Sequence, residues 1–142
     1  MKQCLDIASS LIRRHEGLEL KPYLCTSGRT TIGYGRNLDD NGISVDEAVS
    51  MLNKDIVNSL IECCEMFSNF GKLSDVRQAV LIDMMYNLGK TRLSKFKKMI
   101  TAIHEEDFSR AALEMLDSKW SKQVGKRSVR LANIMKNNEY SE

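Results

Sequence analysis

The sequence lacks the features of a metalloprotein, a membrane protein or a disulfide-stabilised secreted protein. Its four cysteines (Cys4, Cys25, Cys63 and Cys64) form no CxxC pair, and its two histidines have no spacing typical of metal ligands. No apolar run before Arg13 resembles a signal peptide or a membrane anchor. We therefore predict free thiols in a reducing cytoplasm, no metal, no other cofactor and no insertion into a membrane.

The chain also has no strong excess of charge of one sign and few helix-breaking residues. The formal net charge is only +2, which does not by itself imply nucleic-acid binding but suits an acidic polymer. One proline and eight glycines in 142 residues leave room for long helices. Hydrophobic residues make up 42% and charged residues 28%, values typical of a globular protein of one domain or two small lobes.

The character of the chain changes at Gly17. Residues Leu5–Glu16 carry apolar side chains on one face and predict a helix that ends before this glycine. Between Lys21 and Gly35, threonines, aromatics and glycines predict short strands joined by tight turns. The segment "NLDDNG" that follows predicts a polar turn.

Beyond this β section the pattern is helical to the end of the chain. Ser44 and Glu47 form a capping box, which predicts the start of a long helix that reaches about Met66. Asp75–Leu88 is apolar nearly all round, as expected of a helix buried at the centre of a bundle. Further helices are predicted over Leu93–His104, Phe108–Leu116 and Lys126–Met135. The predicted fold class is α+β and mostly helical.

Glu16 is the first candidate for chemistry. It stands at the C-terminal end of the predicted first helix, where the helix dipole favours the protonated form of a carboxyl group. A carboxyl group that keeps its proton suits a general acid. A cleft between a β section and a helical lobe would be a natural binding site. The alternative is a surface glutamate beside a helix cap.

A longer pattern gives Glu16 a context. Eight residues separate it from Cys25, and five more separate Cys25 from Thr31. The segment "HEGLELKPYLCTSGRTTIGYG" with this spacing resembles the phage lysozymes of the T-even type. Downstream, "GISVDEAVSMLNKDI", "VRQAVLIDMMYNLG" and "FSRAALEMLDSKWSKQVGKRSVRL" are similar to that family's connecting helix, buried central helix and C-terminal helices. The resemblance covers nearly the whole chain.

The resemblance implies a lysozyme-like fold and a muramidase. A single lysozyme domain over residues 1–142 would contain an N-terminal helix (1–16), a small β lobe with the catalytic cleft (17–43), and a long helix with a helical lobe (44–142). The enzyme would hydrolyse the β-1,4 bond between N-acetylmuramic acid and N-acetylglucosamine in peptidoglycan. Glu16 would be the general acid, and Thr31 would hold the attacking water or the geometry of the β lobe.

The family also implies residues and partners beyond this segment. Arg127 matches an arginine that reaches back to the catalytic glutamate, and Tyr86 and Asn87 match positions that line the cleft. A phage endolysin of this kind would collect in the host cytoplasm as a monomer, and would depend on a holin to reach the periplasmic wall of a Gram-negative host.

Two departures from the family pattern matter. Cys25 stands where the best-known members carry aspartate, and it could act as a base, a nucleophile or an electrostatic partner, or could be a small buried filler. The stretch Gly35–Gly42 is short, which predicts a trimmed β lobe and a more open cleft.

Three other functions fit parts of the sequence. Cys25 would also suit a peptidoglycan-binding module that has lost catalysis. The basic C-terminal helices would suit a helical nucleic-acid binder, which leaves the β section unexplained. An injected toxin or a wall-remodelling enzyme would keep the chemistry and change its context.

Overall fold

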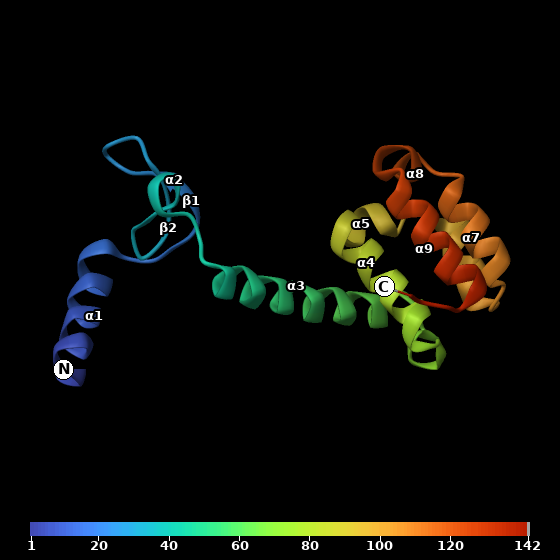
Figure 1. The fold of residues 1–142 in the computed structure, drawn as a ribbon, viewed down its shortest axis with the longest axis horizontal. Coiled ribbons are helices and arrows are strands. Elements are labelled where there is room, and N and C mark those ends of the chain that lie inside the picture. The colour runs from blue at the N-terminus through green and yellow to red at the C-terminus, as the bar shows by residue number, and fades with distance from the viewer. Residues whose placement is uncertain (142) are drawn as a thin grey trace. The chain divides into compact units, whose positions relative to one another are not determined.

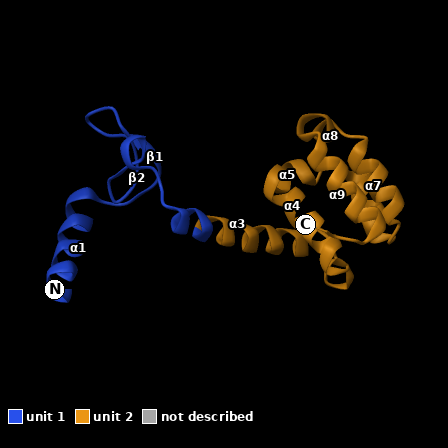
Figure 2. Cartoon of the chain, viewed as in Figure 1, with its two compact units in different colours: residues 1–50 blue, residues 51–142 orange. Residues whose placement is uncertain are grey.

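The computed structural model describes residues 1–141 and divides the chain into two compact units. Unit 1 is Met1–Ser50 and unit 2 is Met51–Glu142 (Figure 2). The long helix α3 (Val45–Met66) begins in unit 1 and continues into unit 2. The predicted α+β, mostly helical class is confirmed.

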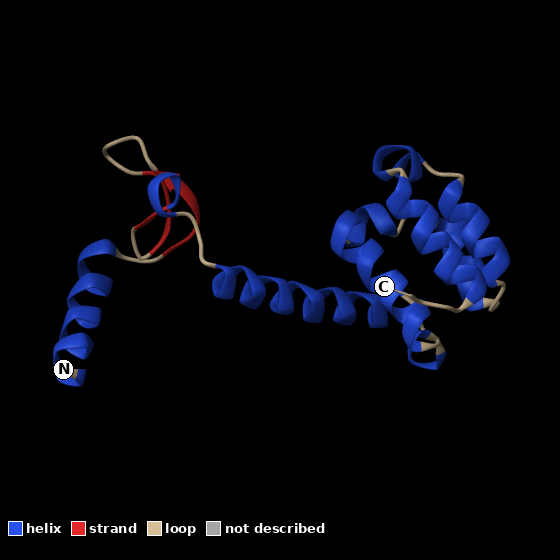
Figure 3. Ribbon diagram, in the orientation of Figure 1, coloured by secondary structure: helices blue, strands red, loops and turns tan. Residues whose placement is uncertain are grey.

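Unit 1 contains the helix α1, a small sheet, the single-turn helix α2 and the first residues of α3. The strands are red in Figure 3. They form an antiparallel sheet with the order β1-β2-β3. Tyr23 pairs with Thr31 and Thr31 with Asn37, so the middle strand carries Thr31 between both neighbours. The elements are α1 (Lys2–Glu16), β1 (Glu19–Leu24), β2 (Thr30–Gly33), β3 (Arg36–Asn37) and α2 (Leu38–Asn41).

Capping side chains explain where α2 and α3 begin. Where "NLDDNG" predicts a polar turn, the structure has the one-turn helix α2, because Asn37 accepts a hydrogen bond from the Asp40 amide and caps it. The capping box before α3 is confirmed: the Ser44 amide donates to Glu47 at 2.9 Å and the Glu47 amide donates to Ser44 Oγ at 3.1 Å. Glu47 also pairs with Arg36, which ties the start of α3 to β3.

Unit 2 is a bundle of helices (Figure 1). Its central helix α4 (Asp75–Leu88) buries side chains at Val80, Leu81, Met84, Met85 and Leu88, as its apolar sequence predicts. The remaining elements are η1 (Phe70–Lys72), α5 (Lys90–Leu93), α6 (Lys97–His104), α7 (Phe108–Leu116), α8 (Lys119–Val124) and α9 (Lys126–Asn137).

The structure corrects the sequence prediction at two places in this bundle. Leu93–His104 is not one helix, because the Ser94 hydroxyl donates to the Thr91 carbonyl at 2.6 Å and a turn separates α5 from α6. Helix α8 was not predicted. It begins because Ser118 Oγ accepts from the Ser121 amide, and it is held in place by buried Trp120.

The apolar core lies in unit 2. Every buried apolar side chain among residues 1–141 falls between Cys63 and Met135, whereas Thr31 is the one buried residue of unit 1. None of the helices in the part of the chain that the structure describes is long and apolar enough to cross a membrane. Unit 1 therefore depends on hydrogen bonds, turns and ion pairs to a greater degree than unit 2 does.

Candidate active site

Glu16 is the last residue of α1, as predicted. Gly17 follows with φ of 69°, and its amide donates to the Arg13 carbonyl at 3.0 Å, which closes the helix. A positive φ of this kind favours glycine. The helix therefore stops directly after Glu16 and leaves its side chain exposed at the helix end.

The turn between β2 and β3 supports this end of the helix. Gly35 lies so close to Glu16 that a Cβ atom added there would be 2.5 Å from Glu16 Oε2. One turn earlier on the same helix, the Arg13 guanidinium lies over the Tyr34 ring, 5.3 Å from its centroid. The carboxyl of Glu16 is thus held against the backbone of the β section.

Cys25 occupies the first position of the tight turn between β1 and β2. Its amide donates to the Arg29 carbonyl at 3.0 Å, and its carbonyl accepts from the Gly28 amide at 2.9 Å. Gly28 has φ of 80°, which lets the chain reverse within this turn. Cys25 Sγ lies 3.1 Å from Ser27 Oγ and is partly exposed, so the alternative of a buried filler does not fit.

Thr31 is tied to the same turn. Its hydroxyl donates to the Arg29 carbonyl at 2.8 Å, the oxygen that also accepts from the Cys25 amide. Its residue surface is only 3% exposed. One backbone oxygen therefore fixes the two residues relative to each other, and a change at Thr31 would disturb Cys25.

The surroundings of Cys25 favour its thiolate. Its pKa is lowered to about 7, first by the hydrogen bond with the Ser27 hydroxyl and then by hydrogen bonds from the backbone of Arg29 and of Ser27. Near neutral pH the thiol and the thiolate are therefore both well populated, so Cys25 can carry a negative charge.

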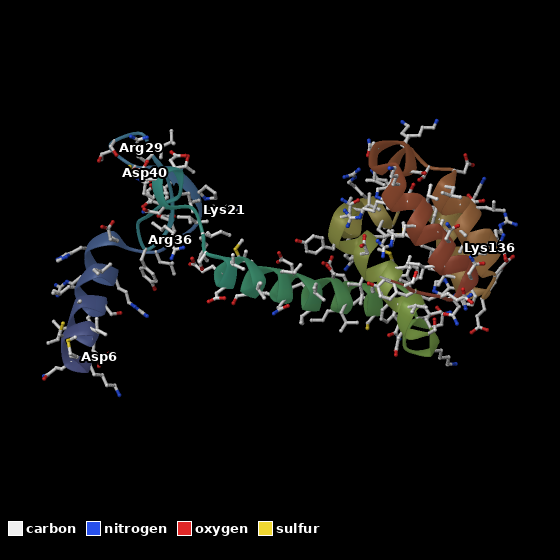
Figure 4. The ribbon with its side chains drawn as sticks, viewed as in Figure 1. Asp6, Lys21, Arg29, Arg36, Asp40 and Lys136 are labelled. Carbon is white, nitrogen blue, oxygen red and sulfur yellow. The ribbon has the colours of Figure 1, made fainter. Side chains whose placement is uncertain are left out.

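The charged side chains of this turn are engaged elsewhere. Arg29 and Asp40 form an ion pair at 3.8 Å, and both are labelled in Figure 4. Asp39 accepts a hydrogen bond from the Thr30 amide at 2.7 Å, which ties α2 to β2. The charge on Cys25 is thus stabilised by a hydroxyl group and backbone amides and not by a neighbouring cation.

The other predicted site residues lie in unit 2. Tyr86 and Asn87 stand near the end of α4, where Tyr86 is exposed and Asn87 Oδ1 accepts from Trp120 Nε1 at 2.6 Å. Trp120 also meets Phe96 edge to face. The amide side chain of Asn87 is thereby held in one orientation, as a binding group requires.

Arg127 lies in the first turn of α9 and binds Asp83 of α4, one helical turn before Asn87. Its Nε and one terminal nitrogen lie 2.9 Å and 2.7 Å from Asp83 Oδ1. Asp83 and Asn87 are four residues apart and share a face of α4. The contact between Arg127 and Glu16 that the family implies stays a prediction.

Sequence reasoning missed three residues of this arrangement: Ser27, Gly35 and Asp83. A signal existed only for Asp83, which precedes Asn87 by one helical turn. Ser27 and Gly35 matter through turn geometry that a lone sequence does not reveal. Among residues 1–141 no three metal-ligating side chains gather at one place.

Comparisons with known proteins agree with this arrangement. The family model described as Phage lysozyme matches residues 13–137. The chain is 27% identical to "Probable T4-type lysozyme 2" of Dictyostelium discoideum, covering 93% of this chain and 95% of that protein. It is 31% identical to "Endolysin" of Acyrthosiphon pisum secondary endosymbiont phage 1, covering 79% and 75%.

A further relative has a different setting. The chain is 26% identical to "Pre-baseplate central spike protein Gp5" of Enterobacteria phage T4, covering 89% of this chain but 27% of that protein. The match to the family model includes Glu16, Cys25, Thr31 and the helices of unit 2 as far as residue 137. The chain belongs to the phage lysozyme family and is a lysozyme-type peptidoglycan hydrolase.

Proposed function

We propose that this lysozyme is a muramidase that hydrolyses the β-1,4 bond between N-acetylmuramic acid and N-acetylglucosamine. The observation that carries the proposal is the placement of an acid and an ionisable thiol in one unit: Glu16 against Gly35, and Cys25 at the turn tied to Thr31. Glycoside hydrolysis needs an acid for the leaving oxygen and a second, negatively charged group for the sugar cation or the attacking water.

Each residue has a separate role in this proposal. Glu16 donates a proton to the glycosidic oxygen, as a general acid does. Cys25, as thiolate, supplies the second, negatively charged group. Thr31 positions Cys25 through the shared Arg29 carbonyl. Tyr86, Asn87 and Arg127 contribute to holding the glycan.

The test is the loss of turbidity of purified peptidoglycan. The intact protein is expected to clear the suspension, and Glu16→Gln to slow clearing by about 10²–10⁴-fold, the usual contribution of a general acid. Circular dichroism would verify that the variant is folded. Clearing that survives Glu16→Gln would contradict the assignment of the acid.

The fragments released from peptidoglycan identify which glycosidic bond is cleaved. A muramidase leaves N-acetylmuramic acid at the new reducing ends, whereas a glucosaminidase leaves N-acetylglucosamine there, and mass spectrometry after reduction separates the two. Reducing ends of the second kind would contradict the proposal. Binding of the wall by folded protein without release of fragments would favour the alternative of an inactive peptidoglycan-binding module.

The biological setting is part of the proposal. We infer that the protein serves host cell lysis as a monomer, held in the host cytoplasm until a holin admits it to the periplasm, and that it binds no nucleic acid. The relative named endolysin supports this setting. The relative named as a central spike protein favours a second setting, in which such a domain is part of a larger protein. Production of the protein in a bacterium with and without a holin tests this setting. We expect lysis only when the holin is present.

A further inference from the structure

The turn that follows β1 contains more than the two residues of the family pattern. It brings the Ser27 hydroxyl to 3.1 Å from Cys25 Sγ, within hydrogen-bond reach for sulfur. The backbone fixes this approach, because the Cys25 carbonyl accepts from the Gly28 amide and the Cys25 amide donates to Arg29. Ser27 is thus presented to the sulfur by the turn itself.

The direction of this hydrogen bond depends on the state of the sulfur. A thiol can donate or accept, whereas a thiolate can only accept, so in the charged state the Ser27 hydroxyl must be the donor. Hydrogen bonds to an ionised group are stronger than those between neutral groups. The contact therefore stabilises the charged form more than the neutral form.

We propose that Ser27 is a positioning residue of this enzyme: its hydroxyl donates to Cys25 Sγ, fixes the sulfur in place and favours its thiolate form. This inference rests on the proposed function, in which Cys25 replaces a carboxylate. It explains how a cysteine serves there without a cation beside it. The lowered pKa of Cys25, with the Ser27 hydrogen bond as the largest cause, agrees with the geometry.

Other titratable groups of unit 1 do not take this role. On the loop and on α2, Arg29 pairs with Asp40, and Asp39 accepts from the Thr30 amide. On β3, Arg36 pairs with Glu47. None of these groups contributes to the lowered pKa of Cys25, nor do Glu16 of α1 or Glu19, Lys21 and Tyr23 of β1.

The test is the titration of Cys25 in the full chain, by ultraviolet thiolate absorbance and by the rate of alkylation with iodoacetamide. The exposed thiols Cys4 and Cys64 are first replaced by serine. Cys63 can stay, because burial raises the pKa of its thiol to about 12 and keeps it silent. The reference protein is expected to titrate near pH 7.

Ser27→Ala should raise the midpoint of the Cys25 thiol titration. A rise of about one pKa unit would slow alkylation at pH 7 about five-fold, because the thiolate fraction falls by that factor. Ser27→Thr, which keeps a hydroxyl, should restore the reference behaviour. Thr26→Ala, in the same turn, is the matched control and should titrate like the reference. Ser27→Gly provides a second deletion of the hydroxyl.

The outcomes separate this inference from the proposed function. Titration needs no substrate, so an unchanged midpoint in both Ser27→Ala and Ser27→Gly would overturn the inference even if the enzyme clears peptidoglycan. An equal shift in Thr26→Ala would overturn it too. If the midpoint moves, the acid side of the pH profile of clearing should move with it while the maximal rate is kept. A profile that stays in place would show that Ser27 acts on the thiol but not on the reaction.

Discussion

At the scale of single residues, Gly35 limits where the carboxyl of Glu16, the proposed general acid, can lie. We predict that Gly35→Ala lowers clearing activity by about 10²-fold, because a Cβ atom there would lie 2.5 Å from Glu16 Oε2 and would displace the acid. The positive φ of 75° adds a stability cost of about 1–2 kcal/mol. Activity and urea unfolding, measured on the same samples, check both effects.

Gly42→Ala is the control for this prediction. Gly42 also has a positive φ, of 57°, but nothing lies within 4 Å of a Cβ atom built there. This variant should lose stability and keep the activity of the folded molecules. Equal losses of activity in the two variants would show that backbone strain, and not the contact with Glu16, is responsible.

If Cys25 acts as proposed, the pH dependence of clearing should follow its thiol and differ from that of an aspartate. Its pKa of about 7 means that the thiolate forms as the pH rises through neutrality, so activity should rise through the same range. In Cys25→Asp the rise of activity with pH should occur at lower pH, because an ordinary aspartate is ionised above about pH 4. Cys25→Ser should lose this rise of activity near neutral pH, together with most of the activity.

The rate of clearing measured from pH 4 to pH 9 tests this prediction. A rise of activity at the same pH in the intact protein and in Cys25→Asp would show that another group titrates. Full activity of Cys25→Ser would show that no negative charge is needed at this position.

At the scale of elements, Glu47 anchors the start of α3. Its pKa is lowered to about 2, first by the hydrogen bond with Arg36 and then by that with the Ser44 amide. A lowered pKa stabilises the folded state above the ordinary pKa of 4.5 and loses that contribution as the pH falls toward 2. We predict that Glu47→Gln speeds amide hydrogen exchange in residues 45–49 at pH 7.

The difference between the intact protein and Glu47→Gln should shrink as the pH falls from about 4.5 toward 2, which equilibrium melting over that range would follow. Asp46→Asn is the matched control, since Asp46 stands in the same helical turn and has no ion-pair partner among residues 1–141. An equal effect of Asp46→Asn at pH 7 would point to the helix dipole rather than to the pair with Arg36.

How far the sequence predicts an element depends on whether its signal is local. The capping box at Ser44 and the apolar helix Asp75–Leu88 are complete within a few turns, so their prediction was confirmed. Helix α8 has six residues and depends on Trp120, whose partner Asn87 is 33 positions away. Such a short helix has no periodicity to read.

The same distinction applies to the site. The spacing from Glu16 through Cys25 to Thr31 is visible in the sequence, and the structure places all three in unit 1. The approach of Ser27 to Cys25 and that of Gly35 to Glu16 depend on turn conformations with positive φ at Gly28 and Gly35. Glycine composition permits such turns but does not specify them.

At the scale of the whole molecule, the two units differ in what stabilises them. Leu81 in α4 is fully buried, whereas Leu24 in β1 is 70% exposed. We predict that Leu81→Ala lowers the free energy of unfolding by about 3 kcal/mol through lost burial and a new cavity. Leu24→Ala should change it by no more than about 0.5 kcal/mol. Urea unfolding measures both, and similar losses would contradict this division.

The hydrogen bond between Trp120 and Asn87 makes tryptophan fluorescence a reporter of the proposed site. The chain has a single tryptophan, so all indole fluorescence comes from one site. The residue is 3% exposed, and its indole N–H donates to Asn87, a side chain that we propose binds substrate. A glycan fragment that engages Asn87 would alter the emission of a folded protein, whereas unfolding would shift it to the wavelength of indole in water. One unlabelled sample can thus report both ligand occupancy and loss of structure.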